Sequence, residues 1–461
     1  MSAAATPSHA RRNVMFTAAI AALGGLLFGY DTGIIASALL FIKSDFDLSS
    51  FEQGMVVSAV PVGAIFGAAL AGQLADTYGR RRMILLAAAL FIAGSIVSAL
   101  APGATVLIVA RVFIGFAIGL ASATCPVYIS EVAPANVRGR LVTLFQLAVT
   151  VGILVAYVVG LALEPSQSWE WMLALGAIPA FLLGAGILAM PQSPRWLVMI
   201  GDSIQARKEL LKLREDVDGV DDELHEIERT LSAEKGSWRD LRAPAVKAAL
   251  VVGVGLAVLQ QVTGINTVIY YAPTIIQDTG IDSDSAAILA SIGVGVVNVA
   301  ATVLALWLVS RFGRRPLLVV GVSGMVIALV LLGLAFELGT GGEGLASLAV
   351  IALMVYVAAF AISLGPIFWI LNSEIYPLNA RGHAAGLGTM ANWASNFAIS
   401  LTFLPLINLL GSAPTFWLYA GVGIFTVFFC LRFVPETKGK QLEEIEQIWE
   451  RRVAEKAAAS G

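Results

Sequence analysis

The chain has 461 residues, and 58% of them are apolar before its 45 glycines are counted. Soluble proteins reach roughly 45 to 50% with glycine included, so the composition excludes an ordinary soluble domain and indicates a chain that lies mostly in lipid. The formal net charge of −3 gives no sign of a nucleic-acid partner, and two cysteines in apolar surroundings exclude a disulfide framework or a cysteine-rich metal site.

Twelve apolar segments are each long enough to cross a bilayer as a helix, which takes about 20 residues. The first follows a polar tail and lacks a convincing cleavage site, so we expect an uncleaved first span rather than a signal peptide. In chain order the expected spans are 14–36, 53–74, 83–100, 105–127, 141–163 and 171–190, then 246–272, 286–309, 316–336, 345–370, 383–408 and 415–433.

A charged stretch separates the first six spans from the last six. Its leucines and isoleucines recur at the spacing of short amphipathic helices, so we predict a soluble helical insert there. The predicted fold is an all-α membrane protein with two pseudo-symmetric six-helix bundles. Its parts are an N-terminal tail (1–13), a first bundle (14–191), the insert (192–245), a second bundle (246–434) and a C-terminal tail (435–461).

Lysine and arginine fall almost entirely on one side of the predicted spans. That side carries both tails, the insert and the arginines near residues 80, 138, 311 and 381, whereas the opposite side carries only Lys43. Cytoplasmic loops of membrane proteins hold an excess of basic residues. We therefore expect a multi-pass protein of the cell's inner (plasma) membrane with both termini in the cytoplasm.

Two pairs of similar segments indicate an internal repeat. LADTYGRRRMIL (74–85) matches LVSRFGRRPLLV (308–319), and EVAPANVRG (131–139) matches EIYPLNARG (374–382). The offsets, 234 and 243 residues, are close, so the two halves look like copies of one unit. Parallel repeats of this kind place the substrate near the bilayer midplane, between the halves.

The seventh predicted span carries an unusual number of uncharged polar side chains. Gln260, Gln261, Thr263, Asn266 and Tyr270 fall within QQVTGINTVIYY (260–271), and on one helix they share roughly one side. Buried polar groups without partners cost free energy, so this stripe needs partners. Amides both donate and accept hydrogen bonds, which suits a polyhydroxylated, uncharged ligand. We therefore predict a sugar at the centre of the protein.

An ordered set of motifs runs over nearly the whole chain. The motifs are GGLLFGYDTGII (24–35), GQLADTYGRR (72–81), PVYISEVAP (126–134), PQSPRWL (191–197), QQVTGIN (260–266), GPIFWILNSEIYP (365–377) and PETKGKQLEEIE (435–446). In these motifs the chain resembles the sugar porters of the major facilitator superfamily. The resemblance implies alternating access by rocking of two six-helix halves, with a monosaccharide (a hexose or pentose, such as glucose or xylose) bound between them.

The resemblance assigns a sugar site made of amides and aromatic rings. Amides suit sugar hydroxyls, and the C–H faces of a sugar ring pack on aromatic surfaces. Amides can also hydrogen-bond between helices in a membrane bundle, and aromatic rings can simply pack in the core. A binding role and a structural role therefore both stay open. The predicted substrate-binding residues are Phe28, Gln146, Gln260, Gln261, Asn266, Tyr270, Asn298, Phe360, Trp369, Asn392 and Trp393.

Asp31 and Arg111 are ionisable residues inside predicted spans, and such residues usually face a cavity and pair with each other. A movement that separates the pair would favour proton uptake by the carboxylate. Proton-coupled sugar porters resemble this chain in carrying Asp at this position, so the resemblance favours proton symport. A static ion pair that only joins helices is the alternative.

Charged residues at the cytoplasmic ends of the spans resemble the ion-pair lock of the family, which holds the outward-open state closed. Making and breaking such a lock would bias a two-state equilibrium. Ser310 and Gln192 stand where the family usually carries acidic residues, which removes acceptors from the lock. The predicted gate residues are Asp76, Arg80, Arg81, Glu131, Arg138, Arg311, Arg314, Arg315, Glu374 and Arg381.

No sequence feature suggests an enzyme. The chain has no phosphate-binding loop of the GxxxxGK type, no cluster with metal-ligand spacing and no evident nucleophile and base. We therefore expect no cofactor, with the proton as coupling ion, the lipid bilayer as surroundings, and a monomer, as in the family. The alternatives to symport are a facilitative uniporter, in which Asp31 is dispensable for accumulation, and a sugar sensor that does not transport.

Overall fold

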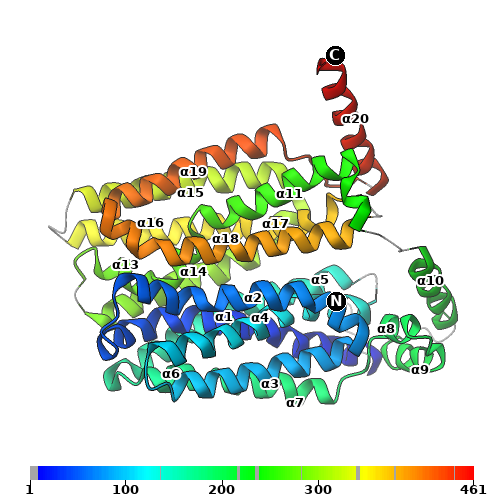
Figure 1. Cartoon of the computed structure of the whole chain (residues 1–461), viewed down its shortest axis with the longest axis horizontal. Coiled ribbons are helices and arrows are strands. Elements are labelled where there is room, and N and C mark those ends of the chain that lie inside the picture. The colour runs from blue at the N-terminus through cyan, green and yellow to red at the C-terminus, as the bar shows by residue number, and fades with distance from the viewer. Residues whose placement is uncertain are drawn as a thin grey trace, which may run out of the picture.

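The computed structural model describes residues 9–134, 137–214, 219–233, 238–281, 283–338, 343–377, 380–440 and 442–460. These residues form helices and no strands, and twelve of the helical segments are long and apolar enough to cross a membrane. The predicted fold class is confirmed. Figure 1 shows the spans lying roughly parallel in two groups, with the first half of the chain below and the second half above.

The first half contains six spans, the last of which is divided into two short helices. Glycines and alanines recur along them, which lets helix backbones approach closely in a membrane bundle. The helices are α1 (His9–Asp45), α2 (Ser50–Tyr78), α3 (Arg80–Ala99), α4 (Ala104–Val132), α5 (Arg138–Leu163) with the 3-10 turn η1 (Glu164–Ser166), α6 (Trp169–Ala174) and α7 (Ala177–Leu188).

The second half also contains six spans, of which the first and fourth are interrupted. Its helices are α11 (Pro244–Val262), α12 (Ile265–Tyr270), α13 (Ala272–Gln277), α14 (Asp284–Arg311), α15 (Arg314–Glu337), α16 (Glu343–Ile362), α17 (Leu364–Glu374), α18 (Arg381–Leu410) and α19 (Ser412–Arg432).

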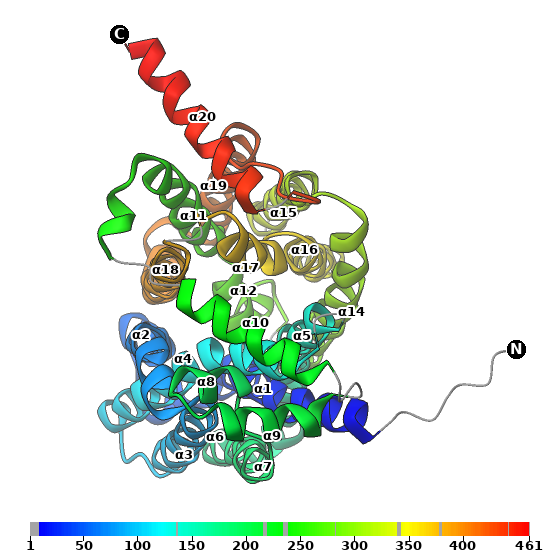
Figure 2. The ribbon, with the colours of Figure 1, turned by 90° about the vertical axis from the view of Figure 1, so that its right-hand side faces the viewer.

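Short helices gather at one end of the molecule, which we call the charged end. Residues 192–245, the predicted insert, contain α8 (Pro194–Met199), α9 (Ser203–Leu213), α10 (Val220–Ala233) and the 3-10 turn η2 (Trp238–Arg242). The last helix, α20 (Leu442–Ser460), projects from the same end, which Figure 2 views directly. Trp449 anchors α20, because its buried indole Nε1 donates to the Ile375 carbonyl at 2.8 Å.

Close helix packing fixes the position of α1 against α5. A Cβ atom added at Gly29 would lie 1.8 Å from the carbonyl oxygen of Val149, and one at Gly152 would lie 2.5 Å from that of Leu26. Only glycine fits at such distances without a backbone shift. The glycines therefore allow the backbones of α1 and α5 to pack in direct contact.

We expect Gly29→Ala to destabilise the protein by about 1 to 3 kcal/mol, the usual cost of forcing extra atoms into a packed core. The measurement is thermal unfolding of the detergent-purified protein. Gly72→Ala is the matched control, because a Cβ atom at Gly72, also on a span of this half, meets no atom within 4 Å. Equal melting temperatures for the two variants would contradict the packing argument.

The polar stripe predicted on one helix lies on two helices instead, which corrects that part of the sequence analysis. Gly264 has φ +93°, in the left-handed region, and ends the run of α11 before α12 begins. The Thr263 carbonyl at the break accepts a hydrogen bond from the Tyr356 hydroxyl at 2.8 Å. Interrupted helices are tolerated within a membrane where side chains satisfy the freed backbone groups. Asn266 therefore approaches the centre from a second helix.

Candidate functional site

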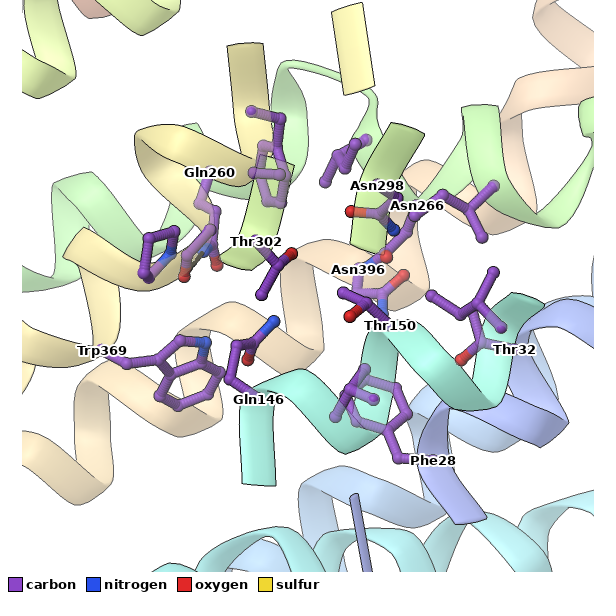
Figure 3. Close-up of a pocket in the computed structure, with 18 of the residues that line it drawn as sticks. Phe28, Thr32, Gln146, Thr150, Gln260, Asn266, Asn298, Thr302, Trp369 and Asn396 are labelled. Atoms are coloured by element: carbon purple, nitrogen blue, oxygen red, sulfur yellow. Dashed lines mark hydrogen bonds between the residues drawn. The ribbon is translucent and has the colours of Figure 1, made fainter. Parts of the chain in front are cut away.

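A pocket lies between the two halves, at the middle of the spans. Helices α1 and α5 line it from the first half, and α11, α12, α14, α16, α17 and α18 line it from the second. Figure 3 shows uncharged polar side chains and aromatic rings pointing into this space. No Asp, Glu, Lys or Arg is among the described residues that line it. The pocket therefore suits a polar, uncharged ligand.

Ten of the eleven predicted substrate-binding residues line this pocket. Tyr270 does not: it is buried behind the lining, where its hydroxyl accepts a hydrogen bond from the Asn396 amide at 3.4 Å. Asn396 itself is part of the lining. The ten lining residues are Phe28, Gln146, Gln260, Gln261, Asn266, Asn298, Phe360, Trp369, Asn392 and Trp393.

Four amides on one side of the pocket form a connected network. Gln261 Nε2 donates to Asn392 Oδ1 at 3.0 Å, and Asn266 Nδ2 donates to Gln261 Oε1 at 2.7 Å. Asn392 Nδ2 donates to Gln260 Oε1 at 2.5 Å, while Gln260 Nε2 donates to the Leu364 carbonyl at the start of α17, at 2.8 Å. The network joins α11, α12, α17 and α18 and so fixes the orientation of each amide.

Two further amides face the pocket with their hydrogen-bonding capacity free. Within the part of the chain that the structure describes, neither Gln146 of α5 nor Asn298 of α14 makes a side-chain hydrogen bond, although Asn298 is only 6% exposed. The indole Nε1 of Trp393 is likewise buried without a partner. Groups of this kind cost free energy until a ligand or water satisfies them.

Aromatic rings form the other surfaces of the pocket. The rings of Phe28 and Trp393 lie 5.3 Å apart between centroids, so they join α1 to α18 across the halves. Trp369 packs edge-on against Phe368 at 4.8 Å and remains 38% exposed. An exposed indole face inside a protein is a suitable surface for the C–H groups of a sugar ring.

Four polar lining residues escaped the sequence analysis. Each lies four residues after a predicted one on the same helix, and that spacing puts two side chains on one helix face. The spacing was therefore a signal that could have identified them. The pairs are Phe28 and Thr32, Gln146 and Thr150, Asn298 and Thr302, and Asn392 and Asn396.

Asp31 and Arg111 pair inside the first half. The Arg111 guanidinium donates to both carboxylate oxygens, at 3.2 and 3.3 Å, and its Nε donates to the Val56 carbonyl at 2.8 Å. The side chains are nearly inaccessible, with Asp31 4% and Arg111 0% exposed. Asp31 is adjacent in the chain to Thr32, which lines the pocket. The ion pair therefore lies beside the pocket lining on α1.

Comparison with known proteins identifies the family. Residues 17–449 match the model of the family described as "Sugar (and other) transporter". The chain is 41% identical to a D-xylose transporter of Levilactobacillus brevis over 95% of this chain and 96% of that one. It is 40% identical to the galactose-proton symporter of Escherichia coli K12, over 94% and 93% of the two chains.

The chain belongs to the sugar transporter family. The fold agrees with this assignment, because the partially occluded inward-open structure of the xylose transporter XylE from E. coli superimposes with a TM-score of 0.83. That match has 34% sequence identity and covers 93% of this chain and 100% of the other. The resemblance to the sugar porters of the major facilitator superfamily is confirmed.

The halves of this sugar transporter touch at the end opposite the charged end. The Tyr157 hydroxyl of α5 donates to the Ile269 carbonyl of α12 at 2.9 Å, and Asn408 of α18 donates to Ser50 of α2 at 2.7 Å. Backbones also meet there, since a Cβ atom at Gly54 would lie 2.7 Å from the Leu401 carbonyl oxygen. These contacts therefore join the two halves on this side of the pocket.

The predicted gate residues form two separate clusters at the charged end. Arg80 pairs with Asp76 at 2.9 Å and with Glu131 at 3.0 Å in the first half. Arg314 pairs with Glu374 at 3.1 Å in the second half. Each of these ion pairs joins groups of the same half. The role of the clusters as a lock between the halves stays a prediction.

Four of the other predicted gate residues contact backbone or a ring, and the fifth, Arg138, is exposed. Arg81 donates to the Leu188 carbonyl, Arg315 to the Leu431 carbonyl, and Arg381 to the Tyr376 carbonyl at 3.4 Å. The Arg311 guanidinium lies over the Trp307 ring, and Arg138 is exposed at the first turn of α5. These positions place all five arginines at the charged end.

Glu436 caps the first turn of α15. Its carboxylate accepts the backbone N–H groups of Arg314 at 2.9 Å, Arg315 at 3.1 Å and Lys438 at 2.9 Å. Partial burial raises the pKa of Glu436, but these three N–H bonds outweigh burial and hold the pKa below its ordinary value of 4.5. In the repeat Gln192 takes this place, and its side-chain oxygen is buried without a partner.

We expect Glu436→Gln to lower stability at pH 7 by about 0.3 to 1 kcal/mol, because glutamine keeps one acceptor oxygen but loses the negative charge that the N-terminus of α15 favours. Because the folded-state pKa is depressed, the contribution is present above pH 4.5 and is lost as the pH falls below that value. Melting temperatures of wild type and variant should therefore differ at pH 7 and converge in acid. A constant difference across this range would contradict a role for the charge.

Proposed function

We propose that this sugar transporter is a secondary active importer that moves a monosaccharide together with a proton by alternating access. The observation that carries the proposal is the central pocket, which both halves line with amides, hydroxyls and indole rings. Monosaccharides present hydroxyls in every direction and no charge, so this lining matches their chemistry. Relatives named for xylose and galactose transport support the same substrate class.

Proton coupling is assigned to Asp31 and Arg111. The pair lies one residue from the pocket lining and is shielded from water, so separating the two charges would leave a buried carboxylate without its partner. Such a carboxylate favours the protonated form. We propose that sugar-driven movement of α1 controls this separation. A uniporter would need no such group.

The arrangement of contacts supports a state that faces the charged end. The halves are joined at the opposite end by Tyr157 and Asn408, whereas the ion pairs of Arg80 and Arg314 remain within their own halves. We propose that the charged end is cytoplasmic, as the excess of basic residues there favours, and that the gate clusters pair across the halves in the outward-facing state. The protein would act as a monomer in the inner membrane.

Radiolabelled uptake into proteoliposomes tests the proposal. D-xylose, D-galactose, D-glucose and L-arabinose are offered with and without an inward proton gradient, with L-glucose and protein-free liposomes as controls. We expect at least one of the four sugars to accumulate above its external concentration only when the gradient is present. Uptake that stops at equilibrium under both conditions would instead show a uniporter, and binding without uptake would show a sensor.

A further inference from the structure

A second hollow lies on the outer surface of the bundle, away from the sugar pocket. It is a groove of about 430 Å³ between α15 and α19, lined by Val326 and Ile327 on one side and by Ile424, Phe428 and Leu431 on the other. It shares no lining residue with the central pocket. Because a water molecule takes up about 30 Å³ of liquid, the groove has room for a long apolar group.

Two guanidinium groups lie at one end of this groove. Arg315 donates to the carbonyl of Leu431, a lining residue, and Arg432 is the next residue along α19. Helix geometry puts both on the groove side: Arg315 and Val326 are eleven residues apart, about three turns, and Arg432 is one turn beyond Phe428. Apolar walls therefore end at a paired positive charge.

These guanidinium groups have no carboxylate partner among the described residues. Arg315 donates to a backbone carbonyl, and its Nε is buried without an acceptor. Arg432 lies over the Phe433 ring at 5.5 Å. Glu436, the nearby acid, uses its carboxylate oxygens on the backbone N–H groups of Arg314 and Arg315. The positive charge at the end of the groove is therefore available to an anion.

We propose that this groove binds one anionic phospholipid, with an acyl chain between α15 and α19 and the phosphate on Arg315 and Arg432. The site is at the ends of two spans, which is the depth of lipid headgroups. Guanidinium groups bind phosphate with strong, charge-assisted hydrogen bonds. The two guanidinium groups should favour an anionic lipid, which has a net negative charge, over a zwitterionic lipid, which has none. Basic residues near the membrane surface attract anionic lipids.

The internal repeat supplies a matched comparison. In the first half Arg81 donates to the Leu188 carbonyl, just as Arg315 donates to the Leu431 carbonyl in the second. The residue after Leu188 is Ala189, however, whereas the residue after Leu431 is Arg432. The helix that accepts this hydrogen bond therefore carries a guanidinium at the next position in the second half and none there in the first. Only the second half should retain the lipid.

Native mass spectrometry of the full-length, delipidated protein tests the proposal, with phosphatidylglycerol and phosphatidylethanolamine as probes. We expect wild type to retain one phosphatidylglycerol in preference to phosphatidylethanolamine. Arg432→Gln should weaken this binding at least about tenfold, the effect of losing one charge-assisted contact. Arg81→Gln should leave it unchanged. Equal retention of the two lipids, or equal losses in the two variants, would overturn the proposal.

A second pair of variants separates chain binding from headgroup binding. Ser323→Trp, which fills the groove, should reduce retention with both arginines in place, whereas Arg432→Lys should restore part of what Arg432→Gln loses. Sugar binding and melting temperature of each variant establish that the protein is folded. If the groove-filling variant retains the lipid as wild type does, or if inorganic phosphate competes for the site as well as the lipid does, no acyl chain occupies the groove.

Discussion

Asp31→Asn should abolish proton-driven accumulation of sugar while the variant still exchanges sugar across the membrane. Asparagine resembles aspartate in shape and still accepts a hydrogen bond from Arg111, but it cannot take up and release a proton. Exchange of internal for external sugar needs only the movement of the loaded carrier, so it should survive. The measurement is uptake into proteoliposomes with an inward proton gradient, compared with counterflow in its absence.

The control for this variant is Asp45→Asn, which alters a carboxylate at the end of the same helix. Asp45 accepts a hydrogen bond from the Trp169 indole at 2.7 Å and lies outside the central pocket. It should keep accumulation. If Asp31→Asn still accumulates sugar against its gradient, the ion pair with Arg111 only joins α1 to α4, and another group carries the proton.

Gln261→Ala should weaken sugar binding by roughly ten- to hundredfold. Gln261 lines the pocket, donates to Asn392 and accepts from Asn266, so its removal takes away its own hydrogen bonds to the sugar and the support of two neighbouring amides. A hydrogen bond contributes about 0.5 to 1.5 kcal/mol, and 1.4 kcal/mol corresponds to a factor of ten. Both remaining amides then lose the orientation that presents them to the sugar.

The effect can be measured as the quenching of tryptophan fluorescence by sugar, because Trp369 and Trp393 line the pocket. Gln53→Ala is the control for the loss of a glutamine amide: Gln53 donates to the backbone carbonyl of Leu48 at 3.0 Å and lies outside the pocket. Its affinity should equal that of wild type. A Gln261→Ala protein that folds and binds sugar with unchanged affinity would remove the amide network from the proposed site.

The resemblance to the sugar porters located most of the candidate site, because its motifs fix positions along the chain. Gln146, Asn298 and Trp369 were assigned in this way, and all three face the pocket. Threonines such as Thr150 and Thr302 were missed because a threonine hydroxyl within a span can donate to a backbone carbonyl of the preceding turn and then needs no other partner. The Thr150 hydroxyl donates to the Leu147 carbonyl in this way, at 3.0 Å. Their helical spacing from the amides was the better signal.

The amino-acid sequence alone was enough to predict the twelve spans, the internal repeat and the side on which positive charge gathers. These follow from hydropathy, segment length and charge, which act locally along the chain. The sequence also identified the family, because each sugar-porter motif is an unbroken run of residues. None of these features depends on which helix packs beside which.

The distribution of the polar pocket residues among the helices depends on tertiary packing. Gly264 interrupts the seventh span, so Asn266 reaches Gln261 from a separate helix and Asn392 joins them from 131 residues away. Tyr270 turns behind the pocket, because Asn396 of α18 binds its hydroxyl there. Hydrogen bonds form between groups that packing brings within about 3 Å, and distance along the sequence does not specify that proximity.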